Sequence, residues 1–346
     1  MDEHCKKYNL SDYYLKYFSH AFIKSKSPKV LYVHTPFCNG KCGYCNAGTK
    51  GAFSKEEFNA FYENTYQKHL DVYSEIFENV KFDQVYFGGG TPTIAAAERL
   101  KEVFDMIPGF KAIAVKCIEA SPHTLSDEHI KLFSEYGFSF LSVGIQSLDP
   151  EICEMHNRKH VLRKQLLELS QKLHDNSLFY NYDLICFLNW GDLRDIPQFE
   201  DDLDFLLKEC RAPSVTIHQY FQSMHTYEKT VALIRLMHRM IQKYPHYSCI
   251  NSLLRDEDVI DETMYETEYR LIRENEHFTH YMWNRFNVLP DEGHDILSIG
   301  YTDTAHTISN ANDVMYIASK NHLKKVKFNP LFQESYHDIR RLKGLA

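Results

Sequence analysis

Six short apolar segments alternate with longer amphipathic segments through the first two thirds of the chain, and this alternation strongly limits the available folds. The average spacing is roughly 35–40 residues per unit, which suits strand–helix units of a parallel sheet. The sequence therefore predicts an α/β protein containing a partial TIM-like (β/α)6 barrel. The predicted strands are Val30–His34, Phe82–Phe87, Ala112–Ala120, Phe138–Ile145, Leu178–Phe187 and Val215–Gln219.

The segments between these strands carry apolar side chains at helical spacing, which predicts helices packed on the sheet. The clearest examples are the stripe Phe58, Tyr62, Tyr66 and Leu70 and the segments Leu125–Tyr136 and Thr226–Tyr244.

Three regions are expected along the chain: a leader over residues 1–28, the barrel over 29–245, and a C-terminal α+β extension over 246–346 that faces the substrate. In the extension, residues 246–275 are rich in charge and predict helix, whereas His280–Phe286 and Asp295–Tyr301 predict strands. No linker rich in Gly, Ser or Pro separates the regions.

Charge and hydropathy exclude several classes of protein. The chain carries 39 Lys and Arg against 47 Asp and Glu, a net charge of −8, which argues against a nucleic-acid partner. The first ten residues lack the apolar core of a secretion signal, and no apolar run is long enough to span a membrane. We therefore expect a cytoplasmic protein without a membrane partner.

Three of the nine cysteines lie together, as Cys38-x3-Cys42-x2-Cys45, in the loop after the first predicted strand. Thiolates select zinc, Cu(I) or iron–sulfur clusters. Structural zinc usually takes four protein ligands in two separated pairs. No second Cys or His pair with suitable context follows, although single cysteines and 19 histidines leave zinc open. A [4Fe–4S] cluster with one iron free of protein ligands fits better.

Further motifs follow the next strands, where the carboxyl ends of parallel strands meet at one edge of the sheet. Each also has a plain structural interpretation, as a turn, a strand-end carboxylate or a solvated arginine. Three glycines would let a ligand approach the backbone closely, and an arginine can bind a carboxylate with two hydrogen bonds. The motifs contain Gly88, Gly89, Gly90 and Thr91, then Glu119, Gln146, Arg158 and Asp183.

With these motifs in this order, the segment from Tyr32 to Cys45 resembles the radical S-adenosylmethionine (radical SAM) superfamily. Within it, the sequence is similar to the oxygen-independent coproporphyrinogen III dehydrogenase-like, or HemN-like, branch, which also includes haem chaperones and some methyltransferases. The resemblance is strong over residues 30–220 and weak over 275–306, and it implies a radical SAM barrel.

The resemblance also implies chemistry. Cys38, Cys42 and Cys45 would hold a [4Fe–4S] cluster whose open iron binds SAM, and an electron from the cluster would cleave SAM to methionine and a 5′-deoxyadenosyl radical that abstracts hydrogen. In the family, the glycine motif holds the SAM amino group, and the residues matching Gln146 and Arg158 contact its ribose and carboxylate. The implied SAM contacts are Tyr44, Gly88, Gly89, Gly90, Thr91, Glu119, Gln146, Arg158 and Asp183. Tyr32 is the candidate catalytic residue, and Trp283, Asn284 and His306 are candidates for the substrate side.

Departures from the family pattern leave the substrate and the fate of the radical open. Cys186–Gly191 replaces the usual Gly-Leu-Pro-Gly, and residue 46 is Asn in a region where the porphyrin enzymes carry a further Cys. We expect a small-molecule, natural-product or tetrapyrrole substrate that is oxidised, methylated or joined by a carbon–carbon bond. Methylation would need a second SAM molecule. A one-electron reductant such as flavodoxin or ferredoxin is also implied.

Two other hypotheses remain. A haem-binding chaperone without radical turnover would use a histidine such as His34, His218 or His306. A structural zinc protein would leave the glycine, glutamate, glutamine and arginine motifs without a role.

Overall fold

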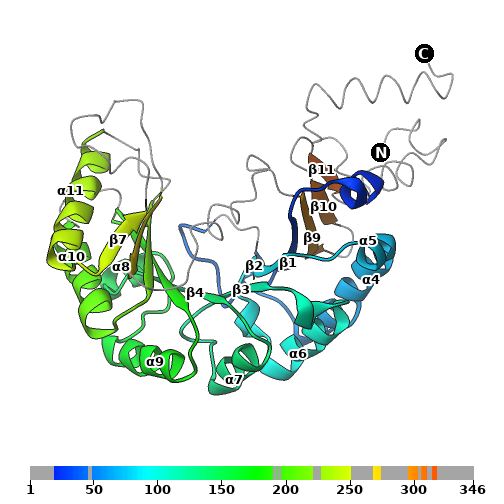
Figure 1. Ribbon diagram of the computed structural model, residues 1–346. Helices are drawn as coiled ribbons and strands as arrows, with labels where there is room; N and C mark the ends of the chain where they lie inside the picture. Colours follow the sequence, from blue (N-terminus) through cyan, green and yellow to red (C-terminus); the bar gives the residue numbers. More distant parts are fainter. Residues whose placement is uncertain are drawn as a thin grey trace, which may run out of the picture.

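The computed structural model describes most of the barrel region and parts of the C-terminal region (Figure 1). The described residues are 19–45, 49–189, 193, 196–220, 227–250, 268–273, 295–302, 305–309 and 314–317. Residues 19–24 form a helix, and the rest of the expected leader before them lies outside this description.

One curved sheet organises the molecule, with strand order β11-β10-β9-β1-β2-β3-β4-β5-β6-β8-β7. The seven strands from β9 to β6 are parallel, and the outer strands β10, β11, β8 and β7 pair antiparallel. Among the described residues no pairing joins the two edges, so the barrel is open. The strands are β1 (Lys29–Thr35), β2 (Gln84–Gly89), β3 (Val115–Ala120), β4 (Phe140–Gln146), β5 (Tyr180–Cys186), β6 (Ser214–Gln219), β7 (Tyr247–Ile250), β8 (Glu268–Arg273), β9 (Asp295–Thr302), β10 (Ala305–Ser309) and β11 (Val314–Ile317).

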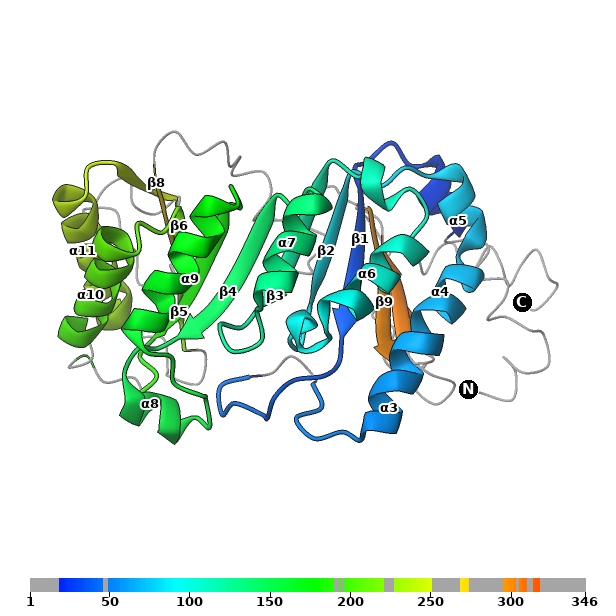
Figure 2. The same cartoon turned by 90° about the horizontal axis from the view of Figure 1, so that it is seen from below.

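Helices cover the outer, convex face of this sheet (Figures 1 and 2). Several begin at residues that cap the free amides of the first turn: Ser54 and Ser126 form capping boxes, and Asp149 precedes a proline at the first helical position. The helices are α3 (Lys55–Ala60), α4 (Tyr66–Val72), α5 (Ser74–Asn79), α6 (Ala97–Met106), α7 (Asp127–Glu135), α8 (Pro150–Met155), α9 (Arg163–Asp175), α10 (Ile196–Asp204) and α11 (Tyr227–Lys243). Shorter helical turns are η1 (Phe61–Thr65), η2 (Pro92–Ile94), η3 (Phe110–Ala112) and η5 (Phe205–Glu209).

The six predicted barrel strands are confirmed as β1 to β6, and the α/β class with a partial barrel is confirmed with them. The predicted strand at Asp295–Tyr301 is also confirmed, as β9, and it adds a seventh parallel strand beside β1. The prediction of helix over 246–275 was wrong where the structure describes that segment, because β7 and β8 are strands. Charged residues in β8 alternate with Tyr269 and Leu271, which is a half-solvated strand pattern. The predicted strand His280–Phe286 lies outside the described residues.

Side chains of each strand alternate between the two faces of the sheet. Leu31 and Val33 of β1 belong to the main core beneath the helices. On the inner face, Tyr86, Cys117 and Phe140 lie opposite one another on β2, β3 and β4 and form a small apolar cluster. The inner positions one step further along these strands are glycine or polar. The glycine and polar positions therefore gather on the inner face, near the carboxyl ends of the strands.

No helix among the described residues combines the length and the apolar character needed to cross a lipid bilayer.

Candidate functional site

The cysteine loop closes on itself directly after β1. Lys50 N donates to Pro36 O at 2.7 Å and Cys38 N donates to Lys50 O at 3.1 Å, so the end of the loop returns to its beginning. Gly43 N donates to His156 O at 2.9 Å, which fixes the middle of the loop against the end of α8. Cys38, Cys42 and Cys45 are all half-buried free thiols on this loop.

The glycine motif at the end of β2 lies against the start of the cysteine loop. Gly90 N donates to Thr35 O at 2.6 Å and Thr91 N donates to Phe37 O at 2.9 Å. The Thr91 hydroxyl lies 3.2 Å from the Cys38 sulfur. Backbone hydrogen bonds therefore join the glycine motif to the start of the cysteine loop.

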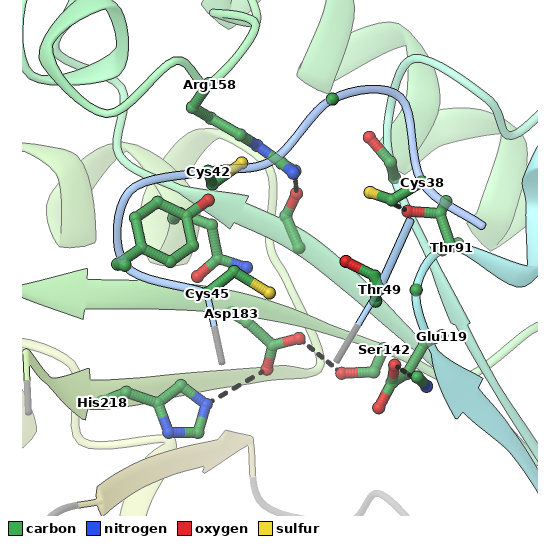
Figure 3. Close-up of a pocket in the computed structure, with 18 residues that line it drawn as sticks. Cys38, Cys42, Cys45, Thr49, Thr91, Glu119, Ser142, Arg158, Asp183 and His218 are labelled. Atoms are coloured by element: carbon green, nitrogen blue, oxygen red, sulfur yellow. Dashed lines mark hydrogen bonds and ion pairs between the residues drawn. The ribbon is translucent and has the colours of Figure 1, made fainter. Parts of the chain in front are cut away.

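One cavity collects most of the residues that the sequence singled out (Figure 3). Arg158 and the three cysteines lie on its loop side, and Asp183, Ser142, Glu119 and His218 lie on its strand side. The cavity is lined by Cys38, Gly40, Cys42, Tyr44, Cys45, Thr49, Gly89, Gly90, Thr91, Glu119, Ala120, Ser121, Ser142, Gly144, Gln146, Arg158, Asp183 and His218.

Five other candidates are placed differently or not described. Gly88 does not line the cavity, and a β-carbon there would meet the Glu119 carboxyl at 3.1 Å. Tyr32 lies deeper on the inner face, stacked on Tyr86 at 5.9 Å between ring centroids. His306 belongs to β10, but its side chain is not described. Trp283 and Asn284 lie outside the described residues.

Arg158 enters the cavity from the connection between α8 and α9. Its Nη2 donates to Gly144 O, whereas its buried Nε has no hydrogen-bond partner among the described residues. Burial opposes the charge of the guanidinium, but the nearby Tyr44 phenol and Cys42 thiol hold its pKa above the usual value. A buried cation with an unused donor is suited to an anionic ligand.

Glu119 sits on the inner face of β3, opposite the glycine motif. Its Oε1 accepts from the Tyr86 hydroxyl at 2.6 Å, and its Oε2 accepts from Gly89 N at 3.2 Å. Burial raises the pKa of Glu119 to about 7, and these two hydrogen bonds only partly oppose the rise.

Asp183 lies between two polar side chains of neighbouring strands. Ser142 Oγ donates to Asp183 Oδ2 at 2.5 Å, and His218 Nε2 lies 3.9 Å from Oδ1. Nearby, Gln146 ends β4 with a φ of 74°, at an irregularity in the β4–β5 pairing. A non-glycine residue held in this region is strained, which is common at ligand sites.

These residues fit an iron–sulfur cluster better than a single metal ion. Three thiols border one cavity, and the donor set is purely sulfur, which iron–sulfur clusters prefer. Within the described part of the chain, no group of three or more His, Cys, Asp or Glu side chains could hold one metal ion. The buried Tyr44 Oη and Arg158 Nε beside the thiols lack hydrogen-bond partners among the described residues, so the cavity offers unused polar groups to a ligand.

Comparison with known proteins agrees with this donor set. Residues 32–199 match the family model of the radical SAM superfamily. The chain is 29% identical over 163 residues to an oxygen-independent coproporphyrinogen III oxidase of Bradyrhizobium diazoefficiens. This alignment covers 45% of this chain and 35% of the relative. It is 28% identical over 138 residues to the heme chaperone HemW of Lactococcus lactis, covering 39% of this chain and 35% of that protein.

Among solved structures, the coproporphyrinogen III oxidase HemN of Escherichia coli has a similar fold. The TM-score is 0.65 at 15% identity, and the match covers 87% of this chain and 69% of HemN. The matched regions span only about a third of the length of the two curated relatives.

Residues 32–199 of the chain match the radical SAM superfamily, and the similarities of the chain lie in the HemN-like branch. That family implies a [4Fe–4S] cluster and SAM as cofactors.

Sequence reasoning did not assign Ser142 to the site, and it considered His218 only as a haem ligand. Both side chains lie on the inner face of the sheet. Ser142 of β4 is in register with Glu119 of β3, and His218 lies on β6, which pairs with the strand that carries Asp183. Counting every second residue from Phe140 along β4 would have placed Ser142 inside. Ala120 is the last residue of β3, and Thr49 and Ser121 come from loops, where no such periodicity exists.

Proposed function

We propose that this protein is a radical SAM enzyme that cleaves SAM reductively and uses the resulting radical on a small-molecule, natural-product or tetrapyrrole substrate. One observation supports it above the others: the three loop thiols share a single cavity with Arg158, Glu119 and Asp183. When bound, the cluster supplies the electron that breaks the C5′–S bond of SAM, giving methionine and a 5′-deoxyadenosyl radical.

Each part of the cavity has a task in this proposal. Cys38, Cys42 and Cys45 would hold the cluster. The Arg158 guanidinium, with its unused Nε, binds the SAM carboxylate. The backbone around Gly89 and Gly90 receives the amino group.

On the strand side, the Gln146 amide donates hydrogen bonds to the nucleoside or accepts them from it, and the Asp183 carboxylate accepts them from it. Glu119 has a raised pKa, so near neutral pH it is available in both protonation states and can exchange a proton with a bound group. The half-buried cavity also limits the access of water to the reacting atoms.

The finer parts of the proposal concern the substrate, the reductant and the number of SAM molecules. The replaced segment Cys186–Gly191 starts with the last residue of β5, the strand that carries Asp183, so this difference in sequence favours a substrate different from that of the porphyrin enzymes. A flavodoxin- or ferredoxin-type donor would supply the electron. A methyltransferase activity would require a second SAM.

Spectroscopy of the anaerobically reconstituted protein tests the assignment of the cofactors. Addition of SAM to the dithionite-reduced protein should change the electron paramagnetic resonance spectrum of a [4Fe–4S]+ cluster. A spectrum unchanged at saturating SAM would contradict SAM binding at the cluster.

A haem chaperone is the second candidate, because HemW proteins are among the similar sequences. Of the histidines considered as haem ligands, His34 is only 4% exposed and packs on Gly89, whereas the His218 side chain is 35% exposed in the cavity wall. His218 is therefore the candidate ligand for this function. Haem titration of wild type and His218→Ala, followed by absorbance, tests this function. Equally weak haem binding by the two proteins would argue against a haem chaperone that uses His218.

A further inference from the structure

A ladder of buried polar side chains crosses the inner face beneath the cavity. Asn181 on β5 lies opposite Ser142 on β4 and Ser214 on β6, and Asp183 lies opposite Thr216. Asn181, Ser214 and Thr216 are fully buried. Burying polar groups without partners is costly, so this ladder needs a reason beyond filling space.

The hydrogen bonds of the ladder fix the orientation of the Asn181 amide. Its Oδ1 accepts from Ser214 Oγ at 2.7 Å and from Thr216 Oγ1 at 2.9 Å. Two hydroxyl donors occupy the oxygen, so the nitrogen end must face the other way. There Asn181 Nδ2 donates to Asp183 Oδ1 at 2.6 Å.

The Asp183 carboxylate is consequently held at both oxygens. Asn181 of β5 donates to Oδ1 and Ser142 Oγ of β4 donates to Oδ2, so donors on two neighbouring strands fix the plane of the carboxylate. Asp183 itself lines the cavity, whereas Asn181, Ser214 and Thr216 do not. Asn181 bonds Asp183 directly, so the ladder reaches the cavity through the Asp183 carboxylate.

We propose that Asn181 is a positioning residue, oriented by Ser214 and Thr216, that aims the Asp183 carboxylate at hydrogen-bond donors of the bound SAM. This inference rests on the proposed function. A carboxylate held at fixed orientation loses no rotational freedom on binding, which is the general advantage of a preorganised site.

The test removes the ladder without leaving unpaired hydroxyls. The triple variant Asn181→Leu, Ser214→Ala, Thr216→Val replaces it with apolar side chains of similar size, whereas Asn181→Leu alone leaves two buried hydroxyls without their acceptor. Tyr182→Phe is the matched control. Tyr182 lies between Asn181 and Asp183 in sequence, but its hydroxyl bonds Ser170 at 2.8 Å in the main core on the outer face.

Three quantities are measured on reconstituted holoprotein: iron content, melting temperature and the Kd for SAM. We expect the triple variant to keep its iron, to melt above Asn181→Leu, and to bind SAM about tenfold more weakly than wild type; we expect the same loss of affinity in Asp183→Asn. Tyr182→Phe should melt lower but bind SAM normally. A triple variant with the wild-type Kd would overturn the positioning role while leaving the proposed function intact.

A smaller change covers the case in which the triple variant does not fold. Thr216→Val removes one donor from the Asn181 oxygen, and Thr216→Ser keeps it. Weaker SAM binding in the valine variant alone supports the inference, and equal Kd values for the two overturn it. A wild-type protein with an intact cluster that does not bind SAM would overturn both proposals.

Discussion

Gly90 lies so close to Phe37 that a β-carbon on Gly90 would stand 2.1 Å from the Phe37 carbonyl oxygen. This contact joins the glycine motif after β2 to the residue immediately before the first cysteine. The position of the cysteine loop therefore depends on the absence of one side chain directly after the neighbouring strand β2.

Gly90→Ala should displace the cysteine loop and prevent stable assembly of the cluster, because the obstructing atom is backbone and cannot rotate away. Iron and sulfide content after anaerobic reconstitution measures the effect. Gly109→Ala is the control: Gly109 has a φ of +70° but nothing within 4 Å of a β-carbon. It should cost about 1–2 kcal/mol of stability and leave the iron content unchanged. Equal iron in the two variants would show that the close contact is not needed.

Replacing Cys38, Cys42 and Cys45 together with alanine should abolish the brown chromophore, since no other thiol borders the cavity among the described residues. Absorbance near the thiolate-to-iron charge-transfer band and iron analysis follow the loss. Cys249→Ala, a half-buried thiol on β7, should keep the full iron content. Four irons retained in the triple variant would refute the ligand assignment.

Arg158→Ala should weaken SAM binding by about tenfold or more while leaving the cluster intact, because it removes a buried cation from the ligand site. Arg99→Ala is a suitable control, since Arg99 is a surface residue of α6 paired with Glu102 at 2.7 Å. Isothermal titration of both variants gives the comparison. Unchanged affinity in Arg158→Ala would place the carboxylate site elsewhere.

The raised pKa of Glu119 predicts a pH dependence of stability in the protein without SAM. Its pKa is about 7 in the folded chain against an ordinary value of 4.5, so the folded state holds the proton more tightly than the unfolded state. The stabilisation is complete below pH 4.5 and is lost as the pH rises through 7. The melting temperature of wild type should therefore fall more between pH 5 and pH 8 than that of Glu119→Gln. Parallel pH profiles for the two proteins would contradict the shifted pKa.

The ion pair between Lys29 and Asp295 should hold β9 against β1. Lys29 Nζ lies 2.5 Å from Asp295 Oδ2, with side-chain exposures of 6% and 0%. Asp295→Asn should cost about 3–5 kcal/mol of unfolding free energy, because it leaves a buried ammonium with backbone carbonyl partners but without its counter-charge. The double variant Lys29→Met, Asp295→Leu should recover most of that loss in urea denaturation. A fully additive double variant would show that the two charges do not interact.

Local patterns predicted the parallel core because each strand from β1 to β6 carries buried apolar side chains at alternate positions, on its outer face. The placement of β9 beside β1 was beyond such reasoning, since it depends on a contact between Lys29 and Asp295 at opposite ends of the chain. The family resemblance named Arg158 and Asp183, which the structure brings into one cavity. It could not show that Arg158 donates to Gly144 or that Asn181 orients Asp183, because these depend on side-chain geometry across strands.

Reductive cleavage of SAM tests the central claim most directly. Anaerobically reconstituted protein is reduced with dithionite, given SAM, and its products are quantified by mass spectrometry beside the variant lacking Cys38, Cys42 and Cys45. We predict 5′-deoxyadenosine and methionine in equal amounts from wild type and neither from the variant. A wild-type protein with an intact cluster and bound SAM that releases no 5′-deoxyadenosine would contradict radical SAM activity and favour the haem-carrier function.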